Sequence, residues 1–131
     1  MGVYIIKSKY SNWIKIGHHK ITNKRPTVYH RYIRRGFNSC KKPYEIIGRV
    51  NFDDLELLKW YNELNIQDET DIHTYLRNID IKNVGEWYYD IGDNLLKITD
   101  YIENNYKCEN KLPSPDELEL AIQWMNKHTC K

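Results

Sequence analysis

Cysteine, glycine and proline are scarce in this chain, and long apolar runs are absent. Its three cysteines, Cys40, Cys108 and Cys130, are odd in number and far apart, which argues against a disulfide framework and against a CxxC-type zinc site. No apolar run approaches the roughly 20 residues needed to cross a bilayer, and the first residues show no basic segment followed by an apolar one. We therefore expect a soluble intracellular protein, cytoplasmic or nuclear, with no membrane partner.

Aromatic and charged residues, by contrast, are abundant, with 11 Tyr, 4 Trp and 29% charged residues in 131 positions. This length suffices for one compact core. The charges are unevenly distributed, because residues 1–50 hold 12 Lys or Arg against one acid whereas residues 51–131 hold 8 against 17. A basic half interleaved with aromatic residues is typical of a surface that binds nucleic acid. The alternative is that the two halves neutralise each other in the fold.

The beginning of the chain predicts a β-hairpin. Residues 2–8 and 12–18 are rich in Val, Ile, Tyr and Trp, and a turn centred on Lys9 and Tyr10 would join them. This turn would place Tyr4 opposite Lys15 on one face of the sheet. The other face would carry the aliphatic residues Val3, Ile5, Ile14 and Ile16.

Two further strands and five helices are predicted beyond the hairpin. Residues 45–52 are read as a third strand of the same sheet, and residues 85–91 as a strand or extended segment. A helix is expected from about Arg25 to Arg35, with Pro26 in its first turn and Gly36 ending it. The remaining helices are predicted at residues 53–64, 68–77, 94–106 and 114–128.

Several short segments together resemble the GIY-YIG nuclease superfamily, especially its phage and large-DNA-virus branch. "GVY" is followed by "KIG" with Tyr4 and Lys15 eleven residues apart, and Arg25 comes eight residues after Gly17. "ETDIHTYL" is similar to that branch's E-x-x-x-H-x-x-L helix, and "GEWYYDI" to its G-E-W-F segment. These segments occur in the family's order between residues 2 and 91. The resemblance rests on their order and spacing taken together, because each segment alone could occur by chance.

The resemblance implies an α+β fold, an α/β sandwich with a small three-stranded, mainly antiparallel sheet flanked by helices. Residues 1–92 would form the nuclease domain, and residues 93–131 a C-terminal helical extension packed on it. The implied activity is hydrolysis of DNA phosphodiester bonds with a single divalent cation, Mg²⁺ or Mn²⁺, in the cytoplasm or nucleus of a host cell.

The resemblance implies five catalytic positions in this chain, Tyr4, Lys15, Arg25, Tyr29 and His73. Tyr4 would position or activate the attacking water. Lys15 stands where the family has its second tyrosine, and it would be a general base if its pKa were lowered, or otherwise a phosphate contact. Arg25 would engage phosphate oxygens through its guanidinium fork, and Tyr29, or alternatively His30, would assist proton transfer.

The metal ligand implied by the resemblance is a helix glutamate, for which Glu69 is the first choice and Glu86 the alternative. His73, four residues after Glu69, would orient the ligand or the waters of the metal and is counted among the catalytic residues. DNA contacts are assigned to the basic residues around the hairpin and first helix, namely His18, His19, Lys24, His30, Arg31, Arg34 and Arg35.

Two other classes of function stay open. One is a DNA-binding module of the same fold with weakened cleavage, which the lysine in place of the second tyrosine favours. The other is a protein-interaction domain, in which the acidic C-terminal helices bind a partner or form a homodimer with a second copy.

Overall fold

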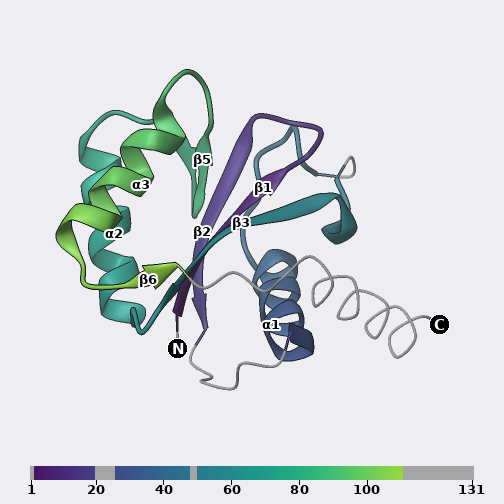
Figure 1. The fold of residues 1–131 in the computed structure, drawn as a ribbon. Coiled ribbons are helices and arrows are strands. Elements are labelled where there is room, and N and C mark those ends of the chain that lie inside the picture. The colour runs from purple at the N-terminus through teal and green to yellow at the C-terminus, as the bar shows by residue number, and fades with distance from the viewer. Residues whose placement is uncertain (1, 20–25, 48–49, 111–131) are drawn as a thin grey trace.

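A computed structural model of the protein describes residues 2–19, 26–47 and 50–110, and for residues 19, 26–32, 53, 109 and 110 it describes the backbone alone. Within these ranges six strands form one sheet in the order β4-β5-β2-β1-β3-β6, and every neighbouring pair is antiparallel (Figure 1). The strands are β1 Gly2–Ser8, β2 Trp13–His19, β3 Leu55–Asn62, β4 Asn83–Val84, β5 Trp87–Tyr89 and β6 Glu109–Asn110. The α+β class is confirmed, but the expected sheet of three strands is wrong.

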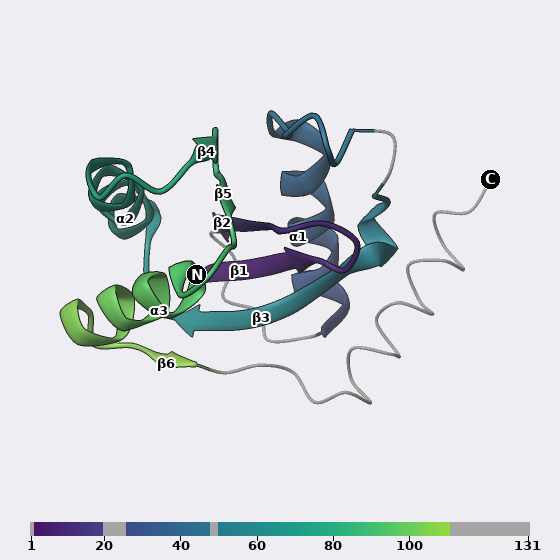
Figure 2. The same ribbon diagram turned by 90° about the horizontal axis from the view of Figure 1, so that it is seen from above.

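Helices cover both faces of this sheet. Helix α1 (Pro26–Ser39) lies on one side, and helices α2 (Ile66–Asn78) and α3 (Asn94–Asn105) lie on the other, as the view from above shows (Figure 2). A short 3₁₀ turn, η1 (Phe52–Asp54), precedes β3. Among the described residues no helix combines the length and the apolar character that spanning a membrane requires.

The predicted hairpin is confirmed, but its register differs by two residues. Tyr4 pairs with Gly17 and Ile6 pairs with Lys15, so Tyr4 and Lys15 are diagonal rather than direct neighbours. The reason is a longer connection, because residues 9–12 all lie outside the strands. Since side chains alternate with a period of two, a shift by two leaves each residue on its predicted face.

The helix predicted at residues 53–64 is wrong, because most of this segment forms β3. Leu, Glu and Lys favour helix by local propensity, yet β3 pairs with β1 from Gly2↔Asn62 to Ser8↔Leu55. Trp60 and Tyr61 are both buried, on opposite faces of the sheet. The pairing with β1 also shifts register between Ile5 and Ile6. The apolar residues of β3 therefore do not alternate with polar ones, and its period cannot be recognised from the sequence.

The strand predicted at residues 45–52 is also wrong for residues 45–47 and 50–52, the part of this segment that the structure describes. Residues 44–47 form a turn, in which the Ile46 amide donates a 3.0 Å hydrogen bond to the Pro43 carbonyl. Ile46 and Val50 are buried nonetheless. Ile46 therefore reaches the core from a turn, whereas Ile47 beside it is exposed. A propensity pattern cannot distinguish such a turn from a short strand.

The sheet separates two hydrophobic cores. The α1-side core consists of Tyr4, Ile6, Trp13, Ile33, Phe37, Ile46, Val50, Phe52, Trp60 and Trp87. The core beneath α2 and α3 consists of Val3, Ile5, Ile14, Ile16, Tyr61, Leu64, Ile72, Leu76, Ile81, Tyr88, Ile98 and Ile102. Helix α3 thus packs into the same core as β1 and β2.

The helices predicted at residues 68–77 and 94–106 are confirmed as α2 and α3. Asn65 caps α2 through a reciprocal pair of hydrogen bonds with Asp68, each 2.9 Å long. Helix α1 is confirmed too, but Gly36 does not end it, because the helix continues to Ser39. The helix predicted at residues 114–128 lies outside the described residues.

Candidate active site

The candidate site lies at the edge of β2, beyond Lys15, where its pairing with β5 stops. The register of β5 covers only Trp13, Ile14 and Lys15 of β2. Glu86 stands immediately before β5, and its carbonyl accepts a 3.1 Å hydrogen bond from the Ile16 amide. This bond places the Glu86 side chain at the sheet edge, where groups from both faces can reach it.

Glu86 connects the two faces of the sheet through the two oxygens of its carboxylate. Oε1 lies 3.1 Å from Lys15 Nζ on the α1 side, and Oε2 lies 3.9 Å from His73 Nε2 on the α2 side. The Glu86 side chain is 36% exposed, whereas that of Lys15 is 1% and that of His73 is 7% exposed. Glu86 is therefore the member of the cluster that solvent or a substrate reaches most easily.

Lys15 and Tyr4 form a buried pair behind Glu86. The Lys15 ammonium donates a 2.9 Å hydrogen bond to the Tyr4 hydroxyl. Burial raises the pKa of Tyr4 above its usual value. Burial also works to lower the pKa of Lys15, but attraction to Tyr4 and Glu86 outweighs it, so this pKa is raised. Lys15 therefore stays an ammonium, and the structure does not support the alternative in which it is a general base.

Two glycines leave space for this pair. A Cβ atom on Gly17 would lie 2.6 Å from Lys15 Nζ, and one on Gly36 would lie 2.6 Å from the Tyr4 hydroxyl oxygen. Both distances are shorter than a van der Waals contact. Gly36 therefore has a packing role within α1 in place of the helix-ending role predicted for it.

Helix α2 contributes Glu69 and His73, which are both buried. His18 Nδ1 lies 2.7 Å from Glu69 Oε1, and this bond joins β2 to α2. Burial works to raise the pKa of Glu69, but His73 and His18 outweigh it, so this pKa lies below its ordinary value. Glu69 is therefore a carboxylate at neutral pH, as a metal ligand must be.

The remaining oxygen of Glu69 and one nitrogen of His73 are buried without a hydrogen bond to any described residue. Glu69 Oε2 and His73 Nε2 are 3.6 Å apart, too far for a hydrogen bond. Each such buried group costs about 1–3 kcal/mol. Ligand atoms of Glu69, His73 and Glu86 all lie within 4.8 Å of one another. A divalent cation bound among them would satisfy both unpaired atoms, so the donor set fits a metal ion.

Tyr88 holds His73 from the side away from Glu69 and Glu86. Its hydroxyl is hydrogen bonded to His73 Nδ1, and the two rings stack with centroids 5.5 Å apart. Burial raises the pKa of Tyr88 to about 12. Sequence reasoning missed Tyr88, although its place two residues after Glu86 in an alternating strand was a usable signal.

The other predicted site residues are only partly described. Lys24 and Arg25 lie outside the described residues. The backbones of Tyr29, His30 and Arg31 belong to α1 and that of His19 to β2, and their side chains are outside the description. His18, predicted to contact DNA, is bonded to Glu69 and is 23% exposed.

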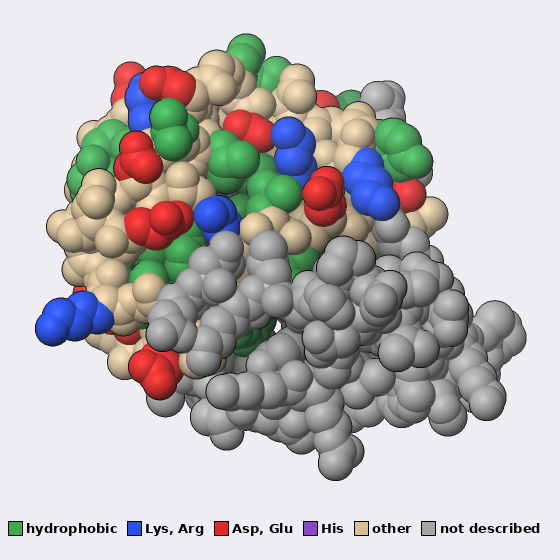
Figure 3. Space-filling view, viewed as in Figure 1, with side chains coloured by type: hydrophobic (Ala, Val, Ile, Leu, Met, Phe, Trp, Pro, Cys, Tyr) green, Lys and Arg blue, Asp and Glu red, His purple; other side chains and the backbone are tan. Residues whose placement is uncertain are grey.

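Two predicted DNA-contacting arginines lie in the second half of α1. The Arg34 guanidinium lies 5.6 Å from the centre of the Phe52 ring, and Arg35 is exposed. On the face seen in Figure 3, acidic side chains are interspersed with Lys and Arg over α2 and α3. That face is therefore not uniformly basic.

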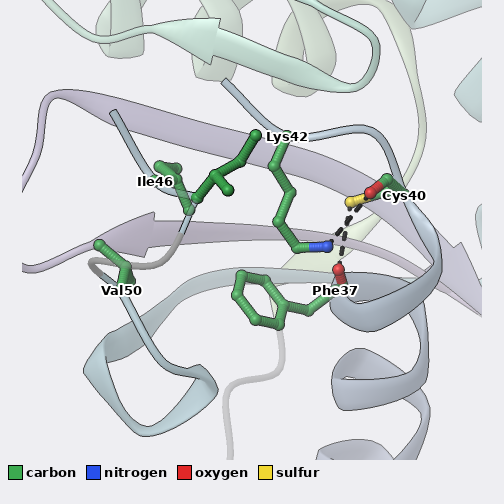
Figure 4. A pocket seen from close by; sticks show the side chains of 6 residues that line it. Phe37, Cys40, Lys42, Ile46 and Val50 are labelled. Atoms are coloured by element: carbon green, nitrogen blue, oxygen red, sulfur yellow. Dashed lines mark hydrogen bonds between the residues drawn. The ribbon is translucent and has the colours of Figure 1, made fainter. Parts of the chain in front are cut away.

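A separate pocket of about 300 Å³ lies on the α1 side of the sheet (Figure 4). It is lined by Phe37, Cys40, Lys42, Ile46, Ile47 and Val50. The Lys42 ammonium donates a 3.2 Å hydrogen bond to the Cys40 carbonyl and lies 4.8 Å from the centre of the Phe37 ring. With its one charged group engaged by the protein itself, this pocket offers less chemistry than the cluster around Glu86.

Comparisons with models of protein families, with curated proteins and with solved structures found no match to this chain. What the site does therefore has to be inferred from its own residues.

Proposed function

We propose that this protein is a divalent-metal-dependent endonuclease that hydrolyses DNA phosphodiester bonds. The observation that carries the proposal is the series of neighbouring polar groups from Tyr4 through Lys15, Glu86 and His73 to Glu69. It brings β1, β2, α2 and the residue before β5 to one edge of the sheet. A buried carboxylate and imidazole with unpaired atoms, next to a half-exposed carboxylate, suit a cation that acts on a phosphate ester.

The residues of the cluster have different roles in the proposed reaction. Glu69 and the half-exposed Glu86 would hold the cation, which would compensate the charge of the phosphoryl group and lower the pKa of the attacking water. Lys15 is too deeply buried to touch DNA, so its ammonium acts as a positioning group that orients the Glu86 carboxylate. Tyr4 is as buried as Lys15, and it too acts through its neighbour rather than on the water directly.

The basic half of the chain supports DNA as the substrate. Residues 1–50 carry eleven more positive than negative charges, counted as 12 Lys or Arg against Glu45. Contacts of such residues with phosphates release condensed counterions, so the affinity for DNA should fall steeply as salt rises. An affinity independent of salt would contradict a phosphate-based interface.

The proposal is tested by plasmid nicking with Mg²⁺ and with Mn²⁺. Wild type should nick, and Glu69→Gln, which keeps the shape but removes the charge, should abolish nicking without changing DNA affinity. Asp71→Asn is the matched control, because Asp71 is an exposed acid on the same helix, and it should nick like wild type. Salt-dependent binding without nicking under either metal would reject the enzyme and favour a DNA-binding module. Absence of DNA binding would reject both.

A further inference from the structure

We infer that the cation is held by three protein ligands, Glu69 Oε2, His73 Nε2 and Glu86 Oε2, and that this site selects a transition metal such as Mn²⁺ over Mg²⁺. The inference rests on the proposed function for its catalytic meaning, but the binding of metal can be measured without DNA. The resemblance implied one glutamate ligand and treated Glu86 as an alternative to Glu69, whereas here both carboxylates face one imidazole.

The two distances from His73 Nε2 to the carboxylate oxygens are close to those of a filled coordination shell. Ligands about 2.0–2.2 Å from one ion lie about 2.8–3.6 Å from each other at octahedral or tetrahedral angles. His73 Nε2 lies 3.6 Å from Glu69 Oε2 and 3.9 Å from Glu86 Oε2. All three ligand atoms lie within 4.8 Å of one another. To bind one ion together, the Glu86 carboxylate would have to approach the other two ligands, and its side chain is the least buried of the three.

The groups around the ligands prepare them for an ion. When His73 Nδ1 donates its hydrogen to the Tyr88 oxygen, the lone pair of Nε2 faces the two carboxylates. His18 holds the other oxygen of Glu69, and Lys15 holds the other oxygen of Glu86. Each of the three ligands thus has one atom fixed by a neighbouring residue and one atom directed to the centre.

A metal-free ion pair explains this geometry less well. A protonated His73 between two carboxylates would form charge-assisted hydrogen bonds of about 2.7–2.9 Å. The observed separations of 3.6 and 3.9 Å are longer than such hydrogen bonds by about 0.7–1.2 Å. They leave a gap between the ligand atoms that an ion fills and a shared proton does not.

The imidazole decides the class of metal. Mg²⁺ prefers oxygen ligands and keeps most of its waters, whereas imidazole nitrogen suits Mn²⁺, Co²⁺ and Zn²⁺ increasingly well along the first transition row. A site with one nitrogen and two carboxylate oxygens therefore gains affinity for these ions. Removal of the nitrogen should lower the affinity for transition metals far more than the affinity for Mg²⁺.

The experiment is a metal titration of the full chain after treatment with a chelator. Calorimetry should show one Mn²⁺ per chain, bound at least ~10-fold more tightly than Mg²⁺, and Co²⁺ should give a visible absorption spectrum on binding. His73→Gln and Glu86→Gln should each weaken Mn²⁺ binding by about 10–100-fold or more. Asp71→Asn should bind Mn²⁺ like wild type.

Glu86→Gln keeps the test decisive if His73→Gln fails to fold, because Glu86 is half-exposed. Absence of Mn²⁺ and Co²⁺ binding to folded wild type would overturn the inference, as would binding unaffected by Glu86→Gln. Metal binding as expected without nicking would support the three-ligand site and contradict the nuclease proposal. Nicking that proceeds equally well with Mg²⁺ and is retained in Glu86→Gln would support the nuclease and overturn the three-ligand site.

Discussion

Replacement of Gly36 by alanine should destabilise the protein, although the same change usually stabilises a helix. Within a helix, alanine is favoured over glycine by about 1 kcal/mol. At this position, however, the new Cβ would lie 2.6 Å from the Tyr4 hydroxyl oxygen. Tyr4 would have to move by on the order of 0.5–1 Å to restore an ordinary contact.

Tyr4 has little freedom to make that movement. Its side chain is 1% exposed, its ring lies parallel to that of Trp60 with centroids 6.3 Å apart, and its hydroxyl accepts the Lys15 hydrogen bond. Overpacking of this kind costs about 1–3 kcal/mol, and weakening a hydrogen bond to a charged group adds about 1–2 kcal/mol. After the gain in helix propensity, we expect a net loss of about 1–4 kcal/mol.

The assay is urea unfolding followed by tryptophan fluorescence, with Tm as a second measure. Gly36→Ala should lower the urea midpoint and reduce Tm by about 3–15 °C. Asn38→Ala is the control, because Asn38 is exposed in the same helix, and it should change stability by less than about 0.5 kcal/mol. If Gly36→Ala were more stable than wild type, α1 would not pack against Tyr4 as described.

Two further predictions concern tyrosines of the two cores. Tyr4→Phe, which removes the acceptor of the Lys15 hydrogen bond, should reduce nicking by about 10-fold. If Tyr4→Phe were instead as inactive as Glu69→Gln and bound metal normally, Tyr4 would contact the attacking water itself. Tyr61, whose pKa is raised by burial and by its 2.7 Å hydrogen bond to Glu103, should stay neutral when unfolded tyrosine ionises near pH 10. Its contribution to stability is therefore complete below about pH 10 and is lost as the pH rises further. In Tyr61→Phe the free energy of unfolding should decrease less steeply with pH above about 10 than in wild type. An unchanged pH dependence would contradict this assignment.

The edge of β2 explains how groups from opposite faces of a sheet can form one site. Lys15 and Glu69 belong to different sides, and a continuous sheet would keep them apart. Because β5 covers β2 only as far as Lys15, the Glu86 carboxylate can contact both sides around the open edge. The length of a three-residue strand thus determines whether the cluster exists.

Parts of the site could be predicted from local spacing. Glu69 and His73 are four residues apart, and a helix necessarily places such residues on one side. The faces of the hairpin followed from alternation, so Tyr4 and Lys15 were expected on one side of the sheet even though the register was wrong. The pairing of His18 with Glu69 could not be predicted, because 51 residues separate them and only the packing of α2 on β2 brings them together.

The sequence alone determined the elements whose period or end signals are strong, namely the hairpin, the amphipathic helices α2 and α3 and the start of α1 at Pro26. Tertiary structure decided that residues 55–62 form a strand, since their burial against two cores outweighs a helical propensity of a few tenths of a kcal/mol per residue. It also decided that Glu69 and Glu86 lie together, because local rules act over a few residues whereas a site is assembled by contacts between distant ones.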